Sequence, residues 1–161
     1  MPALTRKMVL LGLLVLGLAI QLARPARTNP PVDPARTLEA HVDVPPDVEA
    51  VLTRACVDCH TNRTHWPWYS HIAPVSWLVA SDVNGGRRHM NLSDWEQRHH
   101  HDESPFDEMC TQVRDGDMPP WYYVPLHPRA RLAATDVKAV CDWAASGPRE
   151  RAVERSVSTS K

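Results

Sequence analysis

The apolar positions of this chain form one continuous block near its start and three short periodic segments further along. The block runs from Met8 to Ile20 without a polar residue. The periodic segments place apolar side chains at i, i+3, i+4 and i+7, which is the spacing of one helix face. They are Val48, Val51, Leu52 and Ala55; Phe106, Met109, Cys110 and Val113; and Val137, Val140, Cys141 and Ala144. Since no segment shows the alternation of a half-buried strand, the pattern predicts an all-α fold.

Residues that favour helix ends bound several of these segments. Thr135 and Asp136 precede the apolar positions of the last one and are expected to open it. A further, weaker helix is expected from Pro74 and should stop at Gly85 and Gly86.

Short sequence features distinguish three other segments. Ser93 followed by Glu96 is a capping box and predicts a short helix over residues 94–99. The run His99–His101 either binds a metal or forms a solvated surface, and three adjacent helical residues cannot all face one site. Residues 149–161 read as a polar tail.

The apolar block is a membrane-directed segment. It is apolar on every face, and with its continuation to Ala23 it approaches the roughly 17–25 residues of a spanning helix. A cleaved signal peptide has the same features, but the sequence AIQLARPAR lacks an evident small-x-small cleavage site, which favours an uncleaved anchor. We therefore divide the chain into an anchor or signal segment (1–23), a Pro-rich extended linker (24–44), a helical domain (45–148) and the tail.

Composition and charge narrow the functional classes. With 161 residues, the chain has room for one domain and its appendages. The 18 basic and 19 acidic residues leave a net charge of −1, which excludes the strong positive field of a nucleic-acid-binding protein.

Cys56, Cys59 and His60 form a C-x-x-C-H sequence, the attachment motif of c-type haem. Two thiols three residues apart can bond the two vinyl groups of one porphyrin, and the adjacent imidazole can bind the iron. A thioredoxin-like dithiol would need a βαβ context. Half of a zinc site would need a second Cys/His pair at ligand spacing, which Cys110 and Cys141 do not provide.

Met118 is the leading candidate for a second axial ligand. It lies in the segment GDMPPW, where two prolines stiffen the loop and so favour a fixed sulfur position. Met109 is better explained as a core residue on a helix face, and Met90 lacks the stiffening. Ligation by a second histidine also stays open, with His65, His71, His89 and His127 as the alternatives.

The two remaining cysteines, Cys110 and Cys141, each lie on the apolar face of a predicted helix. An even number of cysteines left over in an oxidising compartment favours a disulfide between these helices. Buried free thiols on the two faces are the alternative.

Residues 56–95 (with WPWYS and IAPVSWLV), residues 116–132 (GDMPPWYYVPLHPRARL) and the closing helix resemble the small haem-binding domain proteins of bacteria, which are single-haem relatives of c-type cytochromes with an N-terminal membrane segment. The resemblance covers about two thirds of the chain. It implies a cytochrome-c-like helical domain with one haem held covalently by Cys56 and Cys59, with His60 as the proximal and Met118 as the distal ligand.

These features lead to one functional hypothesis. We expect a membrane-tethered mono-haem c-type cytochrome that carries single electrons, with its domain in the periplasm and its anchor in a bacterial inner membrane. Covalent haem attachment of this kind is extracytoplasmic, which sets the orientation. The expected partner is a redox protein or a respiratory membrane complex. We expect this chain to bind no nucleic acid and to have no catalytic residues. A haem-based sensor or a peroxidase-like enzyme with an open iron site is the alternative.

Overall fold

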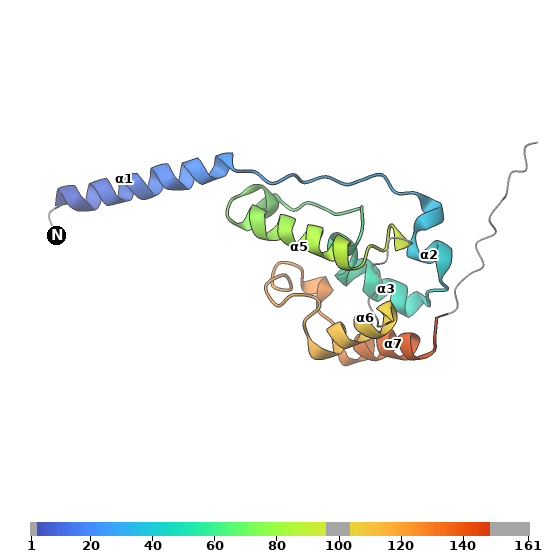
Figure 1. The fold of residues 1–161 in the computed structure, drawn as a ribbon. Coiled ribbons are helices and arrows are strands. Elements are labelled where there is room, and N and C mark those ends of the chain that lie inside the picture. The colour runs from blue at the N-terminus through green and yellow to red at the C-terminus, as the bar shows by residue number, and fades with distance from the viewer. Residues whose placement is uncertain (1–2, 96–103, 149–161) are drawn as a thin grey trace, which may run out of the picture.

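The computed structural model describes residues 3–95 and 104–148, which form helices and no strand, so the all-α prediction is confirmed (Figure 1). In chain order the α-helices and 3-10 helices (η) are α1 (Ala3–Ala19), η1 (Ile20–Leu22), η2 (Pro34–Arg36), α2 (Leu38–His41), α3 (Pro46–Ala55), α4 (Val57–His60), η3 (Trp68–His71), α5 (Val75–His89), α6 (Pro105–Asp115), η5 (Pro128–Ala130) and α7 (Ala134–Ala145). The histidine run, most of the predicted helix over 94–99 and the tail lie outside the described residues.

The N-terminal helix α1 extends away from the rest of the molecule (Figure 1). Thr5–Leu22 has a mean hydropathy of 1.7, and none of this segment is buried. Its length and composition are those of a membrane-spanning helix, and an N-terminal signal sequence would share both properties.

The three periodic segments form α3, α6 and α7, and their apolar faces meet in one core. Phe106, the single phenylalanine, lies between two tryptophans of this core. Its ring centroid is 5.5 Å from that of Trp95 and 5.0 Å from that of Trp143. The Trp143 indole N–H also donates to the Asp43 carbonyl at 3.2 Å, so the aromatic cluster connects α7 to the chain before α3.

The start of α7 differs from the prediction. The residue before the helix is Ala133, not Thr135 or Asp136, and Asp136 lies at the third helical position. There its carboxylate accepts the Ala133 backbone N–H at 2.7 Å and pairs with Arg54 of α3 at 2.6 Å. Arg54 in turn donates to the Arg129 carbonyl. Asp136 therefore secures the first turn of α7 and also connects it to α3.

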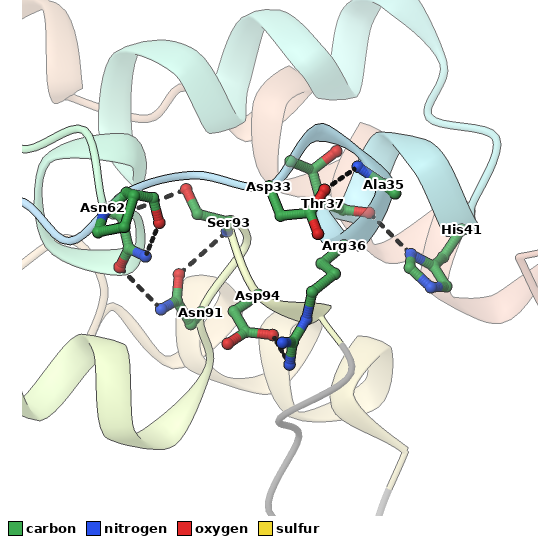
Figure 2. A network of polar contacts seen from close by, with 10 residues as sticks. Asp33, Ala35, Arg36, Thr37, His41, Asn62, Asn91, Ser93 and Asp94 are labelled. Atoms are coloured by element: carbon green, nitrogen blue, oxygen red, sulfur yellow. Dashed lines mark hydrogen bonds and ion pairs between the residues drawn. The ribbon is translucent and has the colours of Figure 1, made fainter.

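The predicted linker is extended only in its first part. Residues 34–44 contain η2 and α2, and Leu38 and Val42 are fully buried in the core. Figure 2 shows the polar contacts of this region, which include the ion pair of Arg36 with Asp94 at 2.7 Å. The Leu38 N–H also donates to the Leu92 carbonyl at 2.8 Å. These residues therefore belong to the packed unit.

Residues 24–33 are also held against the domain. Arg87 of α5 donates to the Thr28 carbonyl at 2.8 Å and to Asn29 Oδ1 at 2.9 Å. Arg27 donates to the Ser70 carbonyl at 3.2 Å. Figure 1 shows this segment running alongside α5 toward α2. Polar side chains thus fix a stretch that has few apolar groups to bury.

Helix α5 begins near Pro74 as predicted but continues through Gly85 and Gly86 to His89. The reason for Gly86 is its close approach to the neighbouring helix. A Cβ at this position would lie 2.7 Å from the Cys59 carbonyl oxygen, whereas a Cβ at Gly85 would meet no protein atom within 4 Å. Gly86 therefore allows α5 to pack against α4.

We expect Asp136→Asn to lower the free energy of unfolding at pH 7 by about 1 kcal/mol, because a charged acceptor at a helix start is lost. Arg54 and the Ala133 N–H hold the pKa of Asp136 below its usual value. The stabilisation is therefore present above the unfolded pKa of about 3.9 and is lost as pH falls through the lower folded value. Urea unfolding at several pH values measures this difference.

Asp142→Asn, which removes an exposed ion pair with Lys138, is the control and should lower the free energy of unfolding by only a few tenths of a kcal/mol. Equal effects of the two variants at pH 7 would contradict this account.

The two glycines of α5 provide a matched pair. Gly86→Ala should destabilise the protein by about 1–3 kcal/mol, because the α4 backbone must move. Gly85→Ala should be neutral or stabilising by up to about 1 kcal/mol, because alanine is the better helix former. Thermal unfolding of the two full-length variants in their haem-free form measures both effects, because both glycines also line the pocket described below. Similar midpoints for the two variants would mean that the close approach to Cys59 does not constrain position 86.

Candidate functional site

The four residues singled out as haem-binding in the sequence, Cys56, Cys59, His60 and Met118, all line one pocket of about 450 Å³. The pocket is formed by α4, α5, α6 and the loop that follows α6. Its volume lies in the range of sites that bind small molecules and cofactors. The fold thus brings together side chains that are up to 62 positions apart in the sequence, counted from Cys56 to Met118.

Cys56, Cys59 and His60 lie on a single helical turn. The carbonyl of Cys56 accepts the backbone N–H of Cys59 at 3.2 Å and that of His60 at 2.9 Å. After the turn, the Thr61 hydroxyl donates to the Val57 carbonyl at 2.7 Å. Local hydrogen bonds therefore present the two thiols and the imidazole from one short helix.

His60 is held in the orientation of a metal ligand. Its Nδ1 lies 2.9 Å from the Met90 carbonyl oxygen, and because a carbonyl only accepts hydrogen bonds, Nδ1 carries the proton. The lone pair of the neutral ring is then on Nε2. Metal-binding histidines commonly donate their second ring nitrogen to a carbonyl in this way. Burial lowers the pKa of His60, which favours the neutral, ligating form.

The backbone of His60 is fixed as well. Its carbonyl accepts the Leu92 N–H at 2.8 Å, and the Leu92 carbonyl accepts the Leu38 N–H at 2.8 Å. The segment from Met90 to Leu92 therefore contacts both the ring and the peptide of His60, and connects it to α2.

Cys56 and Cys59 are not bonded to each other. Burial raises the pKa of each thiol to about 12, and at Cys59 the nearby carboxylates of Asp82 and Asp58 add to this effect. A redox-active dithiol has the opposite property, a lowered thiol pKa. In residues 3–95 and 104–148, no group of three or more His, Cys, Asp or Glu is arranged to hold a metal ion. The environment therefore differs from that of both a thioredoxin-like site and a zinc site.

Met118 reaches the pocket from the loop after α6. Gly116 ends the helix with φ 81°, a left-handed conformation that suits glycine, and the backbone N–H groups of Asp117 and Met118 both donate to the Gln112 carbonyl, at 3.0 and 3.1 Å. These hydrogen bonds fix the backbone of the first residues of the loop. The Met118 side chain is 36% exposed.

The other residues considered as axial ligands lie in different places. Of the alternative histidines, only His89 is among the pocket-lining residues, and Met90 and Met109 also line the pocket. Met109 is buried in the core, as expected for its place on the apolar face of α6. His127 instead stacks on Tyr123, with ring centroids 3.9 Å apart, and its Nε2 is hydrogen-bonded to the Tyr69 hydroxyl.

The aromatic lining of the pocket was not predicted. Tyr122 and Tyr123 had no predicted role, yet both line the pocket, and none of the pocket-lining residues is a tryptophan. Tyr123 donates to Asp58 at 2.8 Å and Tyr122 donates to Asp82 at 3.2 Å. Their position four and five residues after Met118 is the signal that could have indicated them.

Burial and the two carboxylates raise the pKa of Tyr122 and of Tyr123, so both phenols stay protonated and act as donors. Burial also raises the pKa of Asp82, which the hydrogen bond from Tyr122 partly offsets. The mostly apolar lining of the pocket therefore includes protonated thiols and phenols.

Arg87 and Arg88 differ in their surroundings. Arg88 lines the pocket. Arg87 donates to the Thr61 carbonyl and to the Thr64 hydroxyl, both at 2.8 Å, and to the N-terminal segment described above. Arg87 thus connects the turn after His60 to residues 28 and 29.

The remaining cysteines, Cys110 and Cys141, are joined in a disulfide, with their Cα atoms 4.7 Å apart. This bond links α6 to α7 on the side of the core next to the pocket-lining residues Met109 and Val113. It adds a covalent constraint to a domain with a small core.

Comparisons with known proteins agree with a haem site in this pocket. No curated protein and no solved structure was found to match the chain. One family model, described as a haem-binding domain, matches residues 15–146, a range that includes every pocket-lining residue named above. The chain therefore belongs to the haem-binding domain family.

Proposed function

We propose that this haem-binding protein holds one haem covalently through Cys56 and Cys59, with His60 as the proximal iron ligand. The observation that carries the proposal is the hydrogen bond from His60 Nδ1 to the Met90 carbonyl, in a pocket that both thiols also line. It leaves Nε2 for the iron and prevents the ring from turning. The C-x-x-C-H spacing on one helical turn suits two thioether bonds to a single porphyrin.

We propose Met118 as the distal ligand. A second iron ligand would have to come from a different part of the pocket than His60. Met90 belongs to the segment that holds His60, and His89 directly precedes it, whereas Met118 comes from a separate loop fixed on the Gln112 carbonyl. Met109 takes part in the core. A thioether ligand gives haem iron a higher reduction potential than a second imidazole does.

The activity that we propose is transfer of single electrons by a carrier, without a chemical reaction on a bound substrate. Haem, when bound, supplies the reversible change between ferric and ferrous iron. The chain would contribute the axial ligands and a largely apolar lining, in which Tyr122 and Tyr123 remain protonated. Such surroundings limit water near the cofactor and help to set its potential.

We further propose that α1 anchors the carrier in a bacterial inner membrane, with the domain in the periplasm. The support is the apolar span Thr5–Leu22, the disulfide between Cys110 and Cys141, and a haem attachment chemistry that takes place outside the cytoplasm. A redox protein or a respiratory membrane complex would be the partner.

Covalent attachment predicts that haem stays with the polypeptide in acidic organic solvent. Cys56→Ser and Cys59→Ser should each leave one bond, and the double variant should release all haem, as measured by extraction and intact mass. The control is the double variant Cys110→Ser and Cys141→Ser, which removes the disulfide and should keep haem covalently bound. Extraction of haem from the wild-type chain would disprove the attachment.

Methionine ligation predicts a weak long-wavelength band in the ferric spectrum that Met118→Ala abolishes, together with a shift to high-spin bands. Met90→Leu is the control and should keep the band. A wild-type protein that is already high-spin and does not change in Met118→Ala would overturn the carrier proposal. That result would favour a sensor or peroxidase-like enzyme with an open iron site, which the partial exposure of Met118 also permits.

A further inference from the structure

The exposed large apolar side chains of the domain are gathered in two places. Outside α1 and the end of η1, and within the described residues, they fall between residues 68 and 78 or between residues 118 and 126. The first group includes Trp68, Ile72, Val75 and Leu78, which are 74, 46, 41 and 45% exposed, and which we name the apolar corner. It is formed by η3 and the first turn of α5. Apolar clusters of this kind on a protein surface usually mark an interaction site.

The end of the apolar N-terminal helix is fastened directly to this corner. The Gln21 side chain makes two hydrogen bonds to the backbone of Ala73, donating to its carbonyl at 3.1 Å and accepting its N–H at 3.0 Å. The Trp77 indole N–H donates to the Ala23 carbonyl at 2.6 Å. In Figure 1, α1 leaves the molecule beside the start of α5. Wherever residue 22 meets the membrane surface, the apolar corner lies at that surface too.

The charges near the corner suit a lipid surface. Neither residues 1–32 nor residues 59–81 contain an aspartate or glutamate, although the whole chain has 19 of them. Arg24, Arg27 and Arg63 belong to these two segments. Basic side chains are attracted to anionic headgroups, and tryptophan is favoured where the acyl chains meet the headgroups.

We propose that the apolar corner is a lipid-docking surface, on which Trp68, Ile72, Val75 and Leu78 enter the interfacial layer of the bilayer that α1 spans. The proposal rests on the membrane tether of the proposed function and adds an orientation to it. The domain would lie against the membrane in one pose, because residues 24–33 are bonded to it and do not act as a free spacer. A redox partner would then have to reach the haem pocket at the membrane surface.

The test uses the full chain, labelled with 5-fluorotryptophan, in nanodiscs that contain phosphatidylcholine and phosphatidylglycerol. A lipid that carries a nitroxide near its headgroup is added, and fluorine spectra are compared with and without the spin label, so that any broadening by haem iron cancels. Trp68→Phe and Trp77→Phe assign the resonances of Trp68 in the corner and of Trp77 beside it. We expect both resonances to broaden, while the buried Trp95 and Trp143 do not. Broadening of Trp68 no greater than that of Trp95 would overturn the proposal.

A pair of double variants separates the corner from a general effect of charge. Val75→Asp with Leu78→Asp should abolish the broadening of Trp68 by repulsion from the anionic lipid. Thr135→Asp with Ala145→Asp adds the same charge on exposed positions of α7 and should leave the broadening unchanged. Equal loss in both double variants would also contradict docking at the corner.

Failure of the tether and failure of docking give different results. If α1 does not anchor the chain, the protein separates from the nanodiscs during size-exclusion chromatography, and the proposed localisation fails. If the protein stays with the nanodiscs and Trp68 is not broadened, the tether stands and the docking proposal is wrong.

Discussion

The hydrogen bonds between His60 and the segment Met90–Leu92 are the constraint on which the site depends. The Met90 carbonyl fixes the imidazole ring, and the Leu92 N–H fixes the peptide of the same residue. Because the Leu92 carbonyl also accepts the Leu38 N–H, the same segment joins α4 to α2. In the proposed carrier, a ligand held at both ring and backbone would keep its position when the cofactor changes charge, and this rigidity would lower the reorganisation that electron transfer requires.

The core supports this arrangement from the other side. Met109 and Val113 belong to the apolar core and also line the pocket, so the packing of α6 decides the shape of the site. The disulfide of Cys110, which directly follows Met109, joins α6 to α7. A domain of this size buries a limited apolar area, and the covalent bond adds stability that does not depend on more core residues. The cofactor of a haem-binding domain would enlarge this apolar interior further.

The N-terminal region combines two structural roles. Leu38 and Val42 complete the core, while Arg87 and Gln21 supply hydrogen bonds along the stretch between the core and α1. Polar bonds replace apolar contacts where the proline-rich sequence offers little to bury. The course of the chain from α1 to the domain is therefore set by the domain's own surface.

The sequence by itself determined the elements whose signal is local. The period of apolar residues predicted α3, α6 and α7, the uninterrupted block predicted α1, and the spacing of Cys56, Cys59 and His60 indicated the chemistry. The tertiary structure decided what depends on distant partners. Gly86 is needed because α5 passes the Cys59 carbonyl, and Asp136, which the sequence places at the start of α7, also pairs with Arg54 of α3. Tyr122 and Tyr123 line the pocket because the loop after α6 forms part of its wall. Periodicity records which face of a helix is apolar but not which element will cover it, and so these contacts could not be predicted from the sequence.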